Sequence, residues 1–170
     1  MKKLKNILKF AMRLEKQGEN FYTYYAEQVK NPYNKKVFEK LVSIERDHYN
    51  FIKKRYDELY YSTELHDISW VVDTTEVIHP SIFGDAAAHF NDSNIDDMVS
   101  DLAILRMAYT IEDDFSTFYK TVAEKVDDAA IKGFLEALST WEKGHKDLFY
   151  GFYKEQLKDS WGDFEHLFLK

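Results

Sequence analysis

Apolar residues recur every three or four positions along four long stretches of the chain, which is the spacing of one face of an α-helix. The first stretch starts near Leu4 and stops before Pro32, a residue that favours a helix boundary. The pattern predicts four helices, over about 3–30, 33–60, 95–126 and 129–157. A shorter amphipathic segment, 161–169, is predicted to form a tail helix that folds back on the others.

The segment between the second and third predicted helices, 61–94, lacks this spacing and is rich in Asp, Ser and Thr. A connection of about 34 residues is long for a compact domain. We interpret it as a crossover that travels the length of a bundle between two parallel helices. The predicted fold is therefore all-α, a single four-helix bundle over residues 1–170 with a long crossover and a short C-terminal helix.

The second half of the chain repeats the first at an offset of 97 positions, which separates Ala11 from Ala108. The repeated unit is a helical hairpin, so we expect two hairpins related by a pseudo-twofold axis. The further matches are Glu15 with Glu112, Phe21 with Phe118, Tyr22 with Tyr119, Leu41 with Leu138, Glu45 with Glu142 and His48 with His145.

The repeat places carboxylates and imidazoles on the apolar stripes of the helices. These candidate metal ligands are Glu15, Glu45, His48, Glu112, Glu142 and His145. Burying four carboxylates together is costly because of desolvation and mutual repulsion. Two divalent cations would neutralise the four charges. Each Glu-x-x-His spacing also sets a carboxylate beside an imidazole on one helix face.

An alternative is that buried ion pairs with arginine stabilise these carboxylates. Helical spacing lets only Arg106 approach the stripe, and one cation does not neutralise four anions. A third Glu-x-x-His, formed by Glu76 and His79, falls in the crossover outside the repeat, and we interpret it as a chance match.

At these residues the sequence resembles the ferritin-like di-iron superfamily, and within it the rubrerythrin-type branch. The resemblance covers 4–60 and 95–157. It implies two iron ions, with terminal ligands Glu15 and Glu112, bridging ligands Glu45 and Glu142, and capping ligands His48 and His145. It also implies that the hydroxyls of Tyr22 and Tyr119 bond to ligand carboxylates. The alternative for these tyrosines is a core aromatic ring with a polar tip.

The chain departs from the rubrerythrin pattern in two ways. Rubrerythrins typically append a rubredoxin-like domain with four cysteines, whereas this chain has no cysteine. We therefore expect a separate electron-donor protein, such as a rubredoxin. Many rubrerythrins also carry an additional carboxylate one turn after the third-helix Glu. Phe115 stands there in this chain, and the flanking Asp113 and Asp114 are expected to point elsewhere.

Composition excludes several classes of function. The absence of cysteine rules out disulfides, thiolate nucleophiles and iron–sulfur centres. A net charge of −7 without a basic block argues against nucleic acid as a partner. No window approaches 18 consecutive apolar residues and no export signal is recognisable, so we expect no membrane span and a cytoplasmic location. Oxygen and imidazole donors suit iron first, with manganese or zinc as substitutes.

The leading functional hypothesis is a di-iron oxidoreductase that oxidises Fe(II) while it reduces H₂O₂ or O₂. One alternative is a ferroxidase that stores or detoxifies iron inside a large ferritin-like oligomer. Another is a helical interaction module whose metal site is purely structural. The aromatic content, 12 Tyr, 13 Phe and 3 Trp, exceeds what one thin bundle needs for its core, so we also expect a homodimer.

Overall fold

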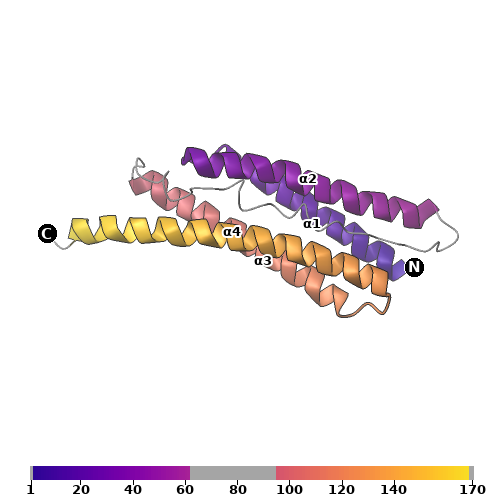
Figure 1. Cartoon of the computed structure of the whole chain (residues 1–170). Coiled ribbons are helices and arrows are strands. Elements are labelled where there is room, and N and C mark those ends of the chain that lie inside the picture. Colours follow the sequence, from indigo (N-terminus) through magenta and orange to yellow (C-terminus); the bar gives the residue numbers. More distant parts are fainter. Residues whose placement is uncertain (1, 62–94, 169–170) are drawn as a thin grey trace. The chain divides into compact units, whose positions relative to one another are not determined.

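The computed structural model describes residues 2–61 and 95–168, and the regular elements within those ranges are all α-helices (Figure 1). They are α1 (Lys2–Ala26), α2 (Pro32–Tyr61), α3 (Ile95–Ala123) and α4 (Ala129–Phe168). The predicted all-α class is confirmed. The helices pack in two pairs, α1 with α2 and α3 with α4, and the chain divides into two compact units that each contain one pair. None of the described helices combines the length and apolar character needed to cross a membrane.

Apolar residues at helical spacing form the interior face of the first hairpin. Tyr22 of α1 and Phe38, Leu41 and Ile52 of α2 are fully buried. Each such side chain stabilises the fold by roughly 1.5–3 kcal/mol relative to its exposed state. The periodicity that predicted these helices therefore also identifies the face that packs.

The second hairpin has an equivalent apolar face and an additional polar link between its helices. Leu105 and Tyr119 of α3 and Leu138 of α4 are fully buried. Beside them the hydroxyls of Ser116 and Ser139 each donate to the other residue's backbone carbonyl oxygen, at 2.9 Å in both directions. These reciprocal bonds fix the height of α3 against α4.

Both hairpins start their second helix with the same kind of N-cap. Asn31 Oδ1 accepts the backbone N–H groups two and three residues further on, at 2.8 and 3.2 Å. Asp128 Oδ1 accepts the equivalent pair at 3.0 Å each. The two residues occupy equivalent positions of the 97-residue repeat, and Pro32 stands at the first helical position, where it is favoured. The turn chemistry of the hairpin is thus repeated along with its core.

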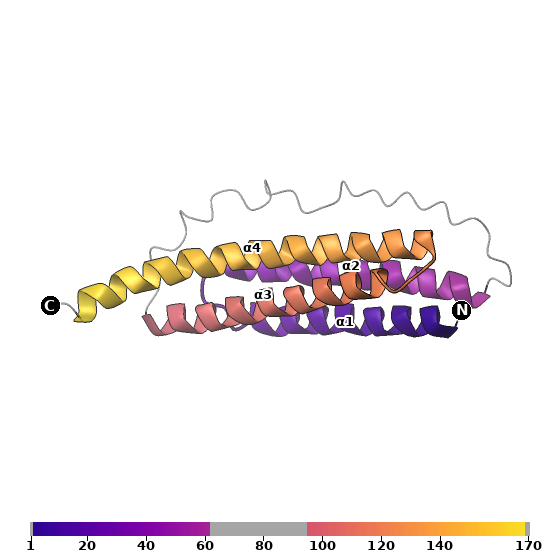
Figure 2. The same cartoon turned by 90° about the horizontal axis from the view of Figure 1, so that it is seen from below.

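The ends of three helices differ from the prediction. The first and third helices end at Ala26 and Ala123, a few residues early, because Val29 and Val126 keep the apolar spacing after the backbone has left the helix. The predicted tail segment is helical but is not a separate element, since α4 continues without a break to Phe168. No Pro or Gly between 152 and 161 provides a stop signal there. Figure 2 shows the yellow end of α4 running past the start of α3.

The crossover predicted over 61–94 lies outside the described residues apart from Tyr61, which ends α2. The third Glu-x-x-His, formed by Glu76 and His79, lies outside them as well. The predicted assembly of both hairpins into one domain stays a prediction.

Candidate metal centre

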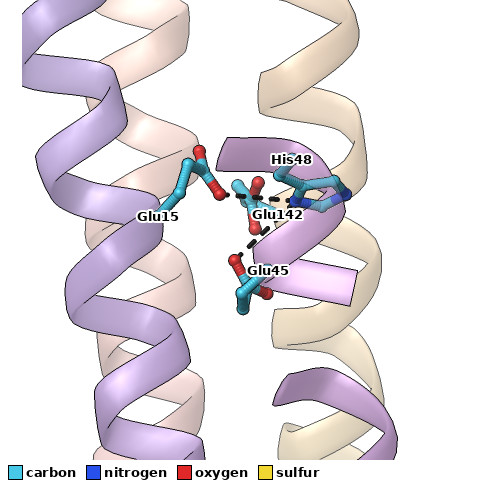
Figure 3. Close-up of side chains that lie close together, drawn as sticks. All are labelled: Glu15, Glu45, His48 and Glu142. Atoms are coloured by element: carbon cyan, nitrogen blue, oxygen red, sulfur yellow. Dashed lines mark ion pairs between the residues drawn. The ribbon is translucent and has the colours of Figure 1, made fainter. Parts of the chain in front are cut away.

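The first hairpin brings together three of the predicted ligands, one from α1 and two from α2. His48 Nδ1 lies 3.4 Å from Glu15 Oε2 and 3.7 Å from Glu45 Oε2 (Figure 3). Both carboxylates are fully buried, whereas the His48 side chain is 11% exposed. One ligand atom from each of the three residues lies within 4.8 Å of the others, a spacing at which they could hold one metal ion.

The second hairpin repeats this cluster with the residues that the sequence makes equivalent. His145 Nδ1 lies 3.2 Å from Glu142 Oε2 and 3.6 Å from Glu112 Oε2. The two carboxylates are fully buried and the His145 side chain is 3% exposed. Here too the ligand atoms lie within 4.8 Å of one another. Each hairpin therefore brings two carboxylates and one imidazole within 4.8 Å of one another.

Helix geometry explains why each cluster forms. Residues three positions apart are neighbours on a helix surface, so the Glu-x-x-His of α2 or α4 projects both groups in the same direction. The partner helix of each hairpin then supplies the second carboxylate from the facing stripe. The small residues one turn before this carboxylate, Ala11 and Ala108, are completely buried.

The charge and donor chemistry of each cluster fit a metal ion. Two ionised carboxylates exceed the charge of even a protonated imidazole by one unit, and burial makes such an excess costly. A divalent cation removes the excess and replaces the lost hydration of the oxygens by direct coordination. Carboxylate oxygen together with imidazole nitrogen is a donor set suited to iron and manganese, and also to zinc.

The two predicted outer tyrosines lie in the aromatic interior of their hairpins. Tyr22 is fully buried, with its ring edge-on to Phe21 at 5.3 Å and to Phe38 at 5.5 Å between centroids. Tyr119 is also fully buried and meets Phe118 at 5.3 Å. These contacts agree with the core-aromatic alternative, and the predicted bond from each hydroxyl to a ligand carboxylate stays a prediction.

The position one turn after the third-helix carboxylate is apolar, as the sequence predicts. Phe115 is buried, while Asp113 and Asp114 are exposed. Asp113 accepts a bond from Lys146 Nζ at 2.7 Å across the outside of the second hairpin, and this contact raises the pKa of Lys146 above its ordinary value. Neither aspartate therefore joins the cluster of its own hairpin.

Glu19 of α1 is a further buried carboxylate, which the apolar pattern alone did not single out. Its oxygens accept bonds from Lys16 Nζ at 2.6 Å and Arg46 Nε at 3.0 Å. The bond from Lys16, together with the bond from Arg46, holds the pKa of Glu19 below its usual value although burial opposes the shift. Its position four residues after Glu15 is the signal that could have revealed it.

The prediction about arginine is wrong in one detail. Arg106 was expected to be the arginine able to approach the carboxylate stripe, but its side chain is exposed. Arg46 of α2 instead reaches across the first hairpin and donates to Glu19 of α1.

Two helical hairpins that each bury a Glu, Glu, His cluster define a helical protein whose buried carboxylates and histidines could hold metal. A model of the rubrerythrin family matches residues 6–153, a range that includes all six residues of the clusters. The chain therefore belongs to the rubrerythrin family, which makes it an iron-binding protein of the ferritin-like type. No curated protein and no solved structure matches the chain.

Proposed function

We propose that this protein is a non-haem di-iron oxidoreductase that reduces H₂O₂ or O₂ while oxidising Fe(II). The observation that supports it is the repetition of one buried Glu, Glu, His cluster in both hairpins, within a chain of the rubrerythrin family. In this proposal the clusters together hold two iron ions. Glu15 and Glu112 would hold the ions as terminal ligands, Glu45 and Glu142 would serve as bridging ligands, and His48 and His145 would each serve as a capping ligand.

The protein's own residues set the conditions for this chemistry. When bound, iron supplies the redox equivalents, cycling between the ferrous and ferric states. The buried carboxylates provide the negative charge that favours the higher oxidation state. Long helices fix the positions of the ligands. Buried apolar residues on the same helices, such as Leu105 two turns before Glu112 and Phe149 one turn after His145, limit access of water and of competing ligands.

Stopped-flow absorbance of the anaerobic, Fe(II)-loaded protein tests this proposal. We expect rapid formation of ferric absorbance on mixing with H₂O₂ or O₂, and the faster oxidant identifies the physiological class of reaction. Glu142→Ala should slow oxidation to the rate of Fe(II) in buffer. Glu136→Ala, an exposed glutamate of the same helix, should leave it unchanged. Equal rates for both variants would contradict the proposal.

The electron donor is proposed to be a separate protein such as a rubredoxin, because the chain contains no cysteine to build a second iron centre of that kind. Reduction of the ferric protein by an added rubredoxin, followed optically under anaerobic conditions, checks this partner. Failure of the rubredoxin to reduce a protein that dithionite does reduce would contradict it.

A further inference from the structure

Three tyrosines form a contiguous aromatic cluster on the second hairpin, away from the apolar interior face. The ring of Tyr109 on α3 lies 5.4 Å from Tyr150 and 5.5 Å from Tyr153 of α4, between centroids. Tyr109 and Tyr153 are half-buried, whereas Tyr150 is 43% exposed. We call these three residues the tyrosine cluster. It extends from the contact between two helices to the surface.

The cluster starts beside the candidate metal centre. Tyr109 precedes the ligand Glu112 by three residues on α3, and residues at this spacing are neighbours about 5–6 Å apart at Cβ. The rings of the cluster are within the 4.5–7 Å range of centroid separations at which aromatic rings are in contact. Ring contacts therefore connect the exposed ring of Tyr150 to Tyr109, which lies one helical turn before Glu112.

The repeat shows that this arrangement is confined to one hairpin. The positions equivalent to Tyr109, Tyr150 and Tyr153 in the first hairpin carry Met12, Lys53 and Tyr56. All six candidate ligands are preserved by the repeat, yet two of the three cluster tyrosines are not. Core packing does not require tyrosines at these positions, because the first hairpin has the same ligands with Met12 and Lys53 at the positions equivalent to Tyr109 and Tyr150.

We propose that the tyrosines of this cluster are redox-active and supply single electrons to the oxidant that is reduced at the metal centre. This inference rests on the proposed function. Hydrogen peroxide needs two electrons and two protons to become two water molecules. When only one Fe(II) is available, the peroxide receives one electron from that ion. A cluster tyrosine gives the second electron and its phenolic proton. One solvent proton completes the balance, which leaves Fe(III) and a neutral tyrosyl radical.

Lys154 modulates the exposed end of the cluster. Its Nζ lies 4.6 Å from the centroid of the Tyr150 ring, where a positive charge opposes loss of an electron from that ring. Removing the charge should therefore make Tyr150 easier to oxidise. Lys154→Gln provides a variant that acts in the opposite direction to loss of a tyrosine.

The test uses the whole chain loaded with one Fe(II) per chain and mixed with H₂O₂ in the presence of a nitroso spin trap. Peptide mass spectrometry then locates the trap adducts. We expect the adduct at Tyr150, its loss in Tyr109→Phe, which keeps the ring and removes the phenol, and an increased yield in Lys154→Gln. Tyr24 of the first hairpin is the internal control, because at 60% exposure it is more accessible to diffusing radicals than Tyr150.

Two results would overturn the inference. Labelling of Tyr24 as strong as that of Tyr150 would show that radicals diffuse through solvent, and an unchanged Tyr150 adduct in Tyr109→Phe would show that the cluster carries no electron. Ferric absorbance is recorded on the same samples. Ferric iron without a Tyr150 adduct contradicts only this inference, whereas iron that stays ferrous contradicts the proposed function as well.

Discussion

At the scale of single residues, the polar side chains inside the hairpins are the feature that distinguishes this protein from a purely structural helical pair. The sequence predicted six of them because glutamates and histidines on an apolar stripe are costly and recur at one repeat offset. The structure buries all of these except His48, which keeps some exposure. Glu19 was missed because its partner Arg46 lies on another helix. The pattern of a single sequence does not show which surface side chains form ion pairs between two helices.

The excess negative charge in each cluster predicts opposite effects of one substitution with and without metal. Glu142→Gln removes a charge next to Glu112 and His145, so the metal-free protein should gain stability by about 1 kcal/mol. The same change removes a ligand, so the stabilisation that Fe(II) or Mn(II) adds should shrink.

Thermal unfolding of the wild type and of Glu142→Gln, with and without metal, measures these two effects. Glu136→Gln is the matched control, since it is exposed on the same helix and should change neither value by more than about 0.5 kcal/mol. A metal-free Glu142→Gln protein that unfolds at a lower temperature than the wild type would contradict the charge argument.

The pairing of Glu19 predicts a pH dependence of stability. Because the folded-state pKa lies below the usual 4.5, ionised Glu19 stabilises the fold above that value, and the contribution is lost as pH falls through the lowered pKa. Glu19→Gln should cost about 1 kcal/mol at pH 7, limited by the exposure of Lys16 and Arg46 to solvent. Urea unfolding at pH 7 and pH 3 should show the difference from wild type shrinking at the lower pH. A difference in stability that does not change with pH would argue against the ion pairs. Glu39→Gln, on the exposed side of α2, serves as the control.

At the scale of elements, the helices were predictable because their apolar spacing is regular, while their ends were less so. Val29 is buried although it follows the end of α1, so burial alone does not mark a helix boundary. The starts of α2 and α4 were better marked, because Asn31 and Asp128 both provide a side-chain oxygen for the first turn. The tail was separated from α4 in the prediction although nothing in 153–160 interrupts a helix.

The cap of α4 can be tested directly. Asp128→Ala removes the acceptor for two backbone N–H groups and should lower the free energy of unfolding by about 1 kcal/mol. Asp128→Asn retains an acceptor oxygen and should recover most of the loss. Denaturant unfolding provides the values, with Asp127→Ala, an exposed neighbour, as control. A loss of equal size in Asp127→Ala would assign the effect to general charge at the helix start and not to the cap.

At the scale of the whole molecule, the repeat produces two compact units that each carry one cluster. The prediction of a homodimer concerns how copies of the chain associate, and sedimentation equilibrium tests it. We expect a mass of about twice the 20.2 kDa of one chain, since surplus aromatic side chains favour an apolar contact between copies. A closed assembly of many chains would contradict the dimer and favour the storage alternative.

The metal content of the protein tests most directly whether the cluster of each hairpin binds iron. Anaerobic equilibrium dialysis against Fe(II), followed by elemental analysis, should give two irons per chain for the wild type. The double variant Glu45→Ala, Glu142→Ala should lose both. The matched double variant Glu39→Ala, Glu136→Ala makes the same change of charge on the exposed sides of α2 and α4 and should retain them. Absence of stoichiometric iron from the wild type, or equal loss in both double variants, would contradict the di-iron account.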